Sequence, residues 1–196
     1  MDSTPGQTFV VFMLLNGVLN IDNSMLQVAV PLWIATATDA PKWLVSVLFL
    51  INVASVALFQ IRLARGSDDV VGASHAGRRA GILLSLACAL MAVSDVTSHL
   101  ITIALLLLAA AAHALGEILE SASGWGVSFA LAPPGMAGQY QGVHAMGRGI
   151  GDLTGPLLLT GVAVTWGWPG WLVIAAIFAF AGLVIPSVVA RARQPV

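Results

Sequence analysis

The sequence predicts an all-α integral membrane protein with six transmembrane helices in a single domain over residues 1–196. Hydrophobic residues make up 58% of the chain and charged residues only 9%, whereas soluble domains average roughly 45–50% and about 25%. Apolar runs near the length of about 20 residues that a membrane span needs recur along the chain. A net charge of −1 leaves no basic surface for nucleic acid.

Short polar connections separate these apolar runs. We expect spans at about 8–34, 43–61, 80–96, 100–131, 141–166 and 168–190. The longest connection is the polar segment 62–79, which is predicted to be a loop, and no connection is long enough for a soluble domain. The first run lacks the positive flank of a secretory signal, so we expect it to remain as a span.

Basic residues gather on one side of the predicted bundle. With six spans, both termini lie on the same side as segment 62–79, and that side carries Arg62, Arg65, Arg78, Arg79, Arg191 and Arg193. The other side has only Lys42. The positive-inside rule therefore predicts a multi-pass protein of the cell membrane with cytoplasmic termini. Abundant alanine, glycine and arginine favour a bacterial source, and hence the bacterial cytoplasmic membrane.

Amide side chains line one side of the first span. The stripe consists of Asn16, Asn20, Asn23 and Gln27, whose spacing places them on one helix face. They either line a substrate cavity or form interhelical hydrogen bonds that only hold the bundle together. Asp22 neighbours the stripe, and the cost of burying a carboxylate favours a functional role. Asn52, near the centre of the second span, fits either a cavity lining or a helix contact.

The fourth span carries His113, Glu117 and Glu120 on one face. Two close carboxylates rarely ionise together, so one glutamate is expected to keep a proton. Two histidines, His113 and His144, could ligate haem or a metal, but no CxxCH or HExxH motif supports this. We therefore predict no cofactor and no metal, and expect both histidines to be hydrogen-bonded residues that line the cavity.

The fifth span combines ionisable and small residues. Its ionisable positions are His144, Arg148 and Asp152, and its glycine ladder is Gly147, Gly151 and Gly155. Glycines at this spacing allow another helix to approach closely. Arg148 has a similar predicted depth to Glu117 and Glu120, so we expect it to pair with one of them. Three carboxylates and one arginine then leave an acid for a proton, a cation or a substrate amine; alternatively, a static ion pair only fixes helix packing.

Two segments resemble the major facilitator superfamily of transporters. The first runs from 116 to 156 and contains the Ala132-Pro133-Pro134 turn, the Gly-Gln-Tyr-Gln-Gly run at 138–142 and the Gly151-x-x-x-Gly155-Pro156 ending. It is similar to the region joining that family's tenth and eleventh spans. Segment 62–79, with Gly66, Asp68, Asp69 and Gly77-Arg78-Arg79, resembles the loop joining the eighth and ninth spans, although residues 70–76 separate the acid from Gly77.

The resemblance covers nearly the whole chain but only the second half of a family fold built from two parallel six-span halves. It implies that the first, second, fourth and fifth spans face the cavity, while the third and sixth are peripheral. The expected function is secondary active transport of a small organic molecule by proton-coupled efflux, not an enzymatic activity. The expected substrate and proton-coupling residues are Asp22, Glu117, Glu120, Arg148 and Asp152.

Two identical chains could replace the two family halves. We therefore expect a homodimer, sealed partly by the glycine ladder or the amide stripe. A non-transporting product is the alternative, either a truncated half or a subunit that pairs with a separately encoded six-span half. A membrane redox subunit that uses His113 and His144 is a third reading.

Overall fold

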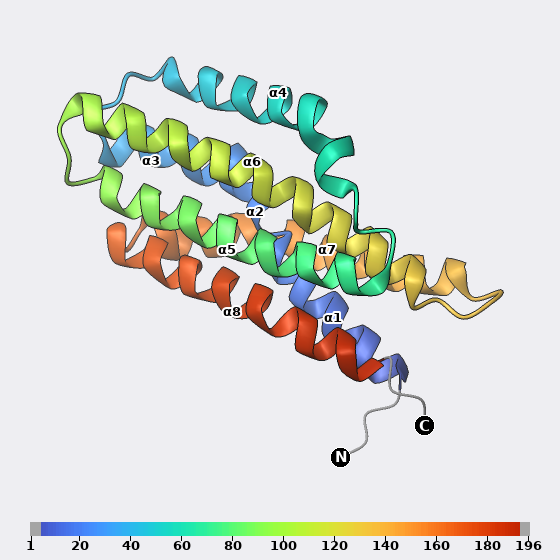
Figure 1. Ribbon diagram of the computed structural model, residues 1–196. Coiled ribbons are helices and arrows are strands. Elements are labelled where there is room, and N and C mark those ends of the chain that lie inside the picture. Colours follow the sequence, from blue (N-terminus) through green and yellow to red (C-terminus); the bar gives the residue numbers. More distant parts are fainter. Residues whose placement is uncertain (1–4, 193–196) are drawn as a thin grey trace.

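The computed structural model describes residues 5–192, and within them helices joined by short turns form the whole architecture (Figure 1). Five helical segments are long and apolar enough to cross a membrane: Gly6–Ala37, Leu44–Ala64, Val70–Ser94, His99–Ala130 and Trp168–Ala192. The all-helical class is thus confirmed, and the long apolar helices indicate a membrane-embedded protein. The count of six spans and the cytoplasmic termini stay predictions, and Arg193 lies outside the described residues.

The first span is an irregular helix. It consists of α1 (Pro5–Leu19), α2 (Asp22–Ser24), the π-helical segment η1 (Met25–Ala29) and α3 (Val30–Ala37). Pro31 has no N–H to donate, and its ring crowds the carbonyl of Gln27, which lies inside η1. This crowding explains the wider turn before the proline. Irregular backbone at membrane depth is tolerated where it meets protein or a water-filled cavity.

The next three helices are α4 (Leu44–Ala64), α5 (Val70–Ser94) and α6 (His99–Ala130). The prediction of a loop over 62–79 is wrong, because only 65–69 lie between α4 and α5. The Asp69 carboxylate caps α5 by accepting a hydrogen bond of 2.6 Å from the Gly72 backbone N–H. Arg78 and Arg79 are exposed while Ala76 is buried, so the polar residues form one side of a helix.

The chain ends with α7 (Ala137–Leu158), the π-helical segment η2 (Leu159–Val164) and α8 (Trp168–Ala192). The glycine ladder of α7 lies against the first span. A Cβ at Gly147 would lie 2.9 Å from the Met13 carbonyl oxygen, and one at Gly151 would lie 2.5 Å from that of Gly17. A Cβ at Gly155 would lie 2.6 Å from the Ser24 side-chain Oγ. The ladder is therefore occupied within the chain, and a homodimer has to use another face.

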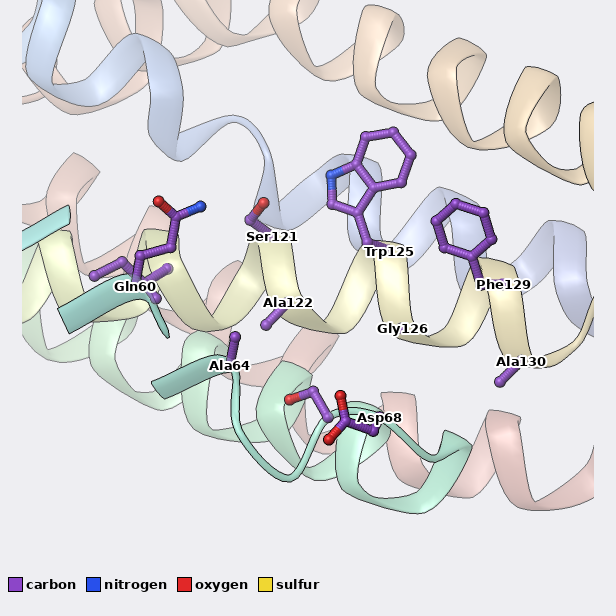
Figure 2. A pocket seen from close by; sticks show the side chains of 11 residues that line it. Gln60, Ala64, Asp68, Ser121, Ala122, Trp125, Gly126, Phe129 and Ala130 are labelled. Atoms are coloured by element: carbon purple, nitrogen blue, oxygen red, sulfur yellow. The ribbon is translucent and has the colours of Figure 1, made fainter. Parts of the chain in front are cut away.

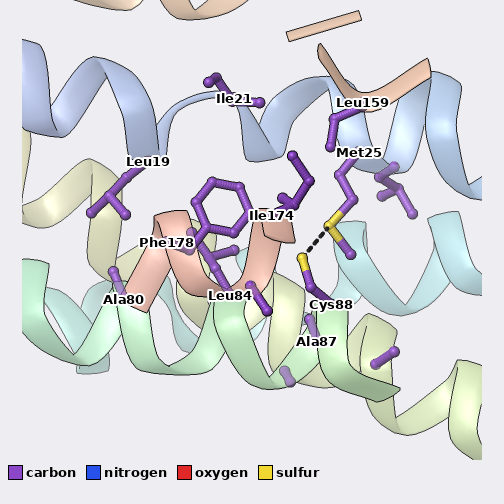
Figure 3. Packing of buried hydrophobic residues seen from close by; sticks show 14 of the residues in the cluster. Leu19, Ile21, Met25, Ala80, Leu84, Ala87, Cys88, Leu159, Ile174 and Phe178 are labelled. Carbon is purple, nitrogen blue, oxygen red and sulfur yellow. Dashed lines mark hydrogen bonds between the residues drawn. The ribbon is translucent and has the colours of Figure 1, made fainter. Parts of the chain in front are cut away.

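An apolar core joins the first span to α5 and α8 (Figure 3). Leu19, Met25, Leu84 and Phe178 are all buried there, and the Cys88 thiol lies 3.9 Å from the Met25 sulfur. This packing anchors the irregular first span on one side, while its asparagines reach α6 and α7 on another.

Helix α4 is the least embedded of the long helices. Only Leu44 and Leu48 are buried in it, and it packs mainly against α6. In Figure 1, α4 accordingly forms one border of the bundle.

The contact between the first span and α7 can be tested with matched glycine substitutions. Gly151→Ala is expected to lower the free energy of unfolding by about 1–3 kcal/mol, because the methyl group would overlap the Gly17 carbonyl. Gly149→Ala adds the same methyl group on the same helix, where a Cβ meets no atom within 4 Å. It should leave stability unchanged or higher. Denaturation in mixed micelles measures both, and equal losses would contradict this packing.

Candidate functional site

The two glutamates of α6 are each bound by an asparagine from a different helix. Glu120 is 2% exposed and accepts a hydrogen bond of 3.0 Å from Asn16 Nδ2. Glu117 accepts one of 2.6 Å from Asn52 Nδ2 of α4. The structure therefore brings residues from the first, second and fourth predicted spans into one polar network.

His113 connects α6 to the break in the first span. Its Nε2 lies 3.0 Å from the backbone carbonyl oxygen of Asp22. A carbonyl can only accept, so Nε2 carries the proton in this hydrogen bond. The other ring nitrogen, Nδ1, lies 4.0 Å from Glu117 Oε2, and Asp22 Oδ2 lies 3.8 Å from Nε2. Asp22, His113 and Glu117 thus form a compact cluster.

Two more amides of the stripe, Asn20 and Asn23, bind α7. Asn20 and Asn23 both donate to Asp152 Oδ1, at 2.9 and 3.1 Å, and Gln27 donates to Asn23 at 2.8 Å. The stripe therefore divides between two helices, because Asn16 binds α6 and the next two asparagines bind α7. Asp152 itself is exposed.

The expected ion pair between Arg148 and a glutamate is wrong. Over residues 5–192, no ion pair within 4.0 Å joins Arg148 to Glu117 or Glu120. The first span contacts both α6 and α7, and its Asn16 already binds Glu120 while Asn20 binds the backbone carbonyl of Arg148 at 3.2 Å. In the structure, the amide side chain of Asn16 makes the contact with a glutamate that was expected of the Arg148 guanidinium.

His144 belongs to a separate polar group. Its Nδ1 lies 3.2 Å from Ser128 Oγ, which also exchanges hydrogen bonds of 3.2 and 3.3 Å with Gln141. The Trp125 ring covers the imidazole at a centroid distance of 4.8 Å. Ser128 and Gln141 were not predicted. The sequence contains one indication of this group: Gln141 precedes His144 by three residues and therefore lies on the same helix face.

A cavity of about 490 Å³ opens beside the cluster. It is lined by Asn23, Leu26, Gln27, Phe49, Asn52, Val53, His113 and Glu117. Amides from two helices and ionisable groups from a third therefore border one space, and the Glu117 side chain is 36% exposed toward its surroundings. Polar groups that converge on one cavity are typical of small-molecule sites, although such sites are usually more apolar than this one.

A second cavity of about 560 Å³ lies between α6 and the end of α4 (Figure 2). Trp125 and Phe129 extend from α6, and Gln60 and Asp68 come from α4 and the following turn. Asp68 is the single charged residue among those that line it. We therefore place the candidate site at the first cavity, where several ionisable groups converge.

The chain was compared with protein-family models and with curated proteins, and neither comparison gave a match. The likeness to the major facilitator superfamily accordingly rests on the sequence motifs at 62–79 and 116–156.

The bond between Asn16 and Glu120 can be tested by a double-mutant cycle. Asn16→Ala and Glu120→Ala should be non-additive by about 0.5–1.5 kcal/mol, because either change alone removes the same interhelical hydrogen bond. Unfolding in mixed micelles gives the four free energies. A control cycle of Asn16→Ala with Asp95→Asn, an exposed residue, should be additive within about 0.5 kcal/mol. Additivity in both cycles would contradict the contact.

Proposed function

We propose that the protein is a proton-coupled secondary transporter that exports small organic cations. The observation that carries this proposal is the cavity of about 490 Å³ bordered by His113, Glu117 and amides, within a bundle of long apolar helices. Ionisable groups inside a membrane are costly and characteristically mark substrate or ion pathways. The motifs that resemble the major facilitator superfamily agree with this function.

The arrangement of charges favours a cationic substrate. Among the described residues, no arginine or lysine forms an ion pair with Asp22, Glu117 or Glu120. Glu117 borders the cavity, so its carboxylate is available to an organic ammonium group. We assign the proton to Glu120, because it is buried and its hydrogen bond comes from the neutral amide of Asn16. Proton release from Glu120 would then accompany binding of the cation.

A six-span topology with cytoplasmic termini is part of this proposal. The described ends of α1 and α8 lie at the same end of the bundle (Figure 1), which supports an even number of crossings. The sixth crossing would be α7 with η2, whose polar residues face the first span. The described arginines of this end are Arg62, Arg65, Arg78, Arg79 and Arg191, all exposed. The positive-inside rule places them in the cytoplasm, for which the bacterial cytoplasmic membrane is the natural setting.

A second six-span unit would complete the cavity. Asn23, Gln27 and Asp152 are exposed in the single chain, although they belong to the polar network. Contact between such groups and lipid is unfavourable. We propose that a second copy of the chain covers this face, as the two parallel halves do in the resembling family.

The oligomeric state tests this part of the proposal. The intact assembly released from lipid nanodiscs, with no other protein co-expressed, is expected to have twice the mass of the chain. The ratio of lipid to protein is varied as a control, because a specific dimer persists on dilution. A monomer at all ratios would contradict the homodimer and favour the alternative, a non-transporting half that needs a separately encoded partner.

Transport itself can be tested in proteoliposomes with ethidium and tetraphenylphosphonium as probes. An imposed pH gradient should drive accumulation of at least one probe, and Glu120→Gln should reduce it to background while probe binding is retained. Asp95→Asn changes an exposed carboxylate outside the network and should transport normally. Gradient-driven accumulation in Glu120→Gln would refute the role of Glu120. No accumulation of either probe by the wild type would count against organic-cation export.

A further inference from the structure

Three different ligand groups converge where the first span breaks. One donor atom from each of Asp22, His113 and Glu117 lies within 4.8 Å of the other two. Asp22 belongs to the first span, while His113 and Glu117 are four residues apart on one face of α6. No short motif reveals this group, since Asp22 and His113 are 91 residues apart in the chain.

Two of these groups have buried polar atoms without a partner. Asp22 Oδ2 and His113 Nδ1 make no hydrogen bond in the described structure, although the residues are only 2% and 3% exposed. Because Nε2 donates to the Asp22 carbonyl, Nδ1 presents its lone pair, and the nearest ionisable atom on that side is Glu117 Oε2 at 4.0 Å. Among the described residues, His113 Nδ1 and Asp22 Oδ2 are thus two buried acceptors without a donor, whereas Glu117 Oε2 accepts a hydrogen bond from Asn52. Asp22 Oδ2 lies 3.8 Å from Nε2, and a cation bound at Nδ1 and both carboxylates would satisfy the two unpartnered atoms.

We propose that Asp22, His113 and Glu117 bind a divalent transition-metal ion, with Zn²⁺ as the best fit. Imidazole nitrogen and carboxylate oxygen are both ligand types that Zn²⁺ uses, and three protein ligands would leave the fourth position open. The two carboxylates together carry the charge that balances a divalent ion. Bonds of about 2 Å would bring the donors to about 3.3 Å from one another, whereas they now lie within 4.8 Å. The side chains must therefore close, and the Asp22 carboxylate must move from Nε2 toward Nδ1.

The surroundings of the cluster match those of metal sites. A ligating histidine almost always donates its second N–H to a carbonyl or carboxylate, which fixes the ring, and His113 does so to Asp22. Ligating carboxylates are likewise held by outer hydrogen bonds, and Asn52 holds Glu117. The cavity of about 490 Å³ borders both His113 and Glu117, which gives the ion access and leaves room for the fourth ligand.

Binding here needs neither a second subunit nor transport. A bound ion would tie the break of the first span to α6 and cancel the charge of Asp22 and Glu117, so it would compete with an organic cation for the Glu117 carboxylate. Glu120 would then be the remaining buried acid of α6. The ion site and the proposed proton carrier are therefore separate groups on one helix.

Metal content of the purified protein tests the proposal directly. The full chain in nanodiscs, stripped with a chelator, is dialysed against buffered Zn²⁺ and bound metal is counted by mass spectrometry. The wild type should bind about one Zn²⁺ per chain, and Asp22→Asn, His113→Gln and Glu117→Gln should each weaken binding at least tenfold. His75→Gln and Asp95→Asn change exposed residues and should bind as the wild type does. Lack of saturable binding, or equal binding by all variants, would overturn the site.

Co²⁺ gives a second readout that requires no variant. Co²⁺ bound by one nitrogen and oxygen ligands in a tetrahedral site absorbs strongly in the visible range, and Zn²⁺ should displace this absorption. A wild-type protein without the band would overturn the tetrahedral site even if the variants fold poorly. Neither metal measurement depends on transport of ethidium or tetraphenylphosphonium. A failure of metal binding can therefore be distinguished from a failure of transport.

Discussion

Carboxylates inside an apolar bundle require hydrogen-bond donors, and the first span supplies most of them. Water does not compete in such a bundle, so each buried acid depends on a neighbouring helix. Asn16 donates to the buried Glu120 of α6, and one turn later Asn20 donates to Asp152 of α7, which is exposed in the single chain. The backbone irregularity that begins at Asn20 adds a further contact, because it offers the Asp22 carbonyl to His113. The position of the first span thereby sets the positions of the polar groups on two other helices.

Backbone proximity makes this hydrogen bonding feasible. Gly17 and Gly147 contact each other so closely that a Cβ at Gly17 would lie 2.6 Å from the Gly147 carbonyl oxygen. At that separation a short asparagine side chain can span the gap, and Asn20 reaches both the Arg148 carbonyl and Asp152. Longer side chains at the glycine positions would push the helices apart. Apolar packing and polar recognition therefore depend on the same small residues.

The sequence was sufficient for features that depend on local composition. Apolar length predicted the long helices, and i, i+4 spacing placed His113 and Glu117 on one face of α6. Prediction from composition failed where one side of a helix is polar. Because Arg78 and Arg79 are charged, the start of α5 was predicted to be a loop, although Ala76 on the same helix is buried. Prediction failed again where partners lie on other helices. Charge and predicted depth paired Arg148 with a glutamate, whereas neutral amides, Asn16 and Asn52, bind both acids.

The exposed position of α4 bears on how the bundle assembles during synthesis. Its main packing partner, α6, follows it in the chain, and only Leu44 and Leu48 of α4 become buried. The nascent α4 must therefore be stable in lipid by itself before α6 is made, which its continuous apolar surface permits. The one strong polar group near its centre, Asn52, finds Glu117 only after α6 inserts. Docking of α4 therefore has to wait for α6, and the wall of the cavity that α4 contributes forms only once α6 is in the bilayer.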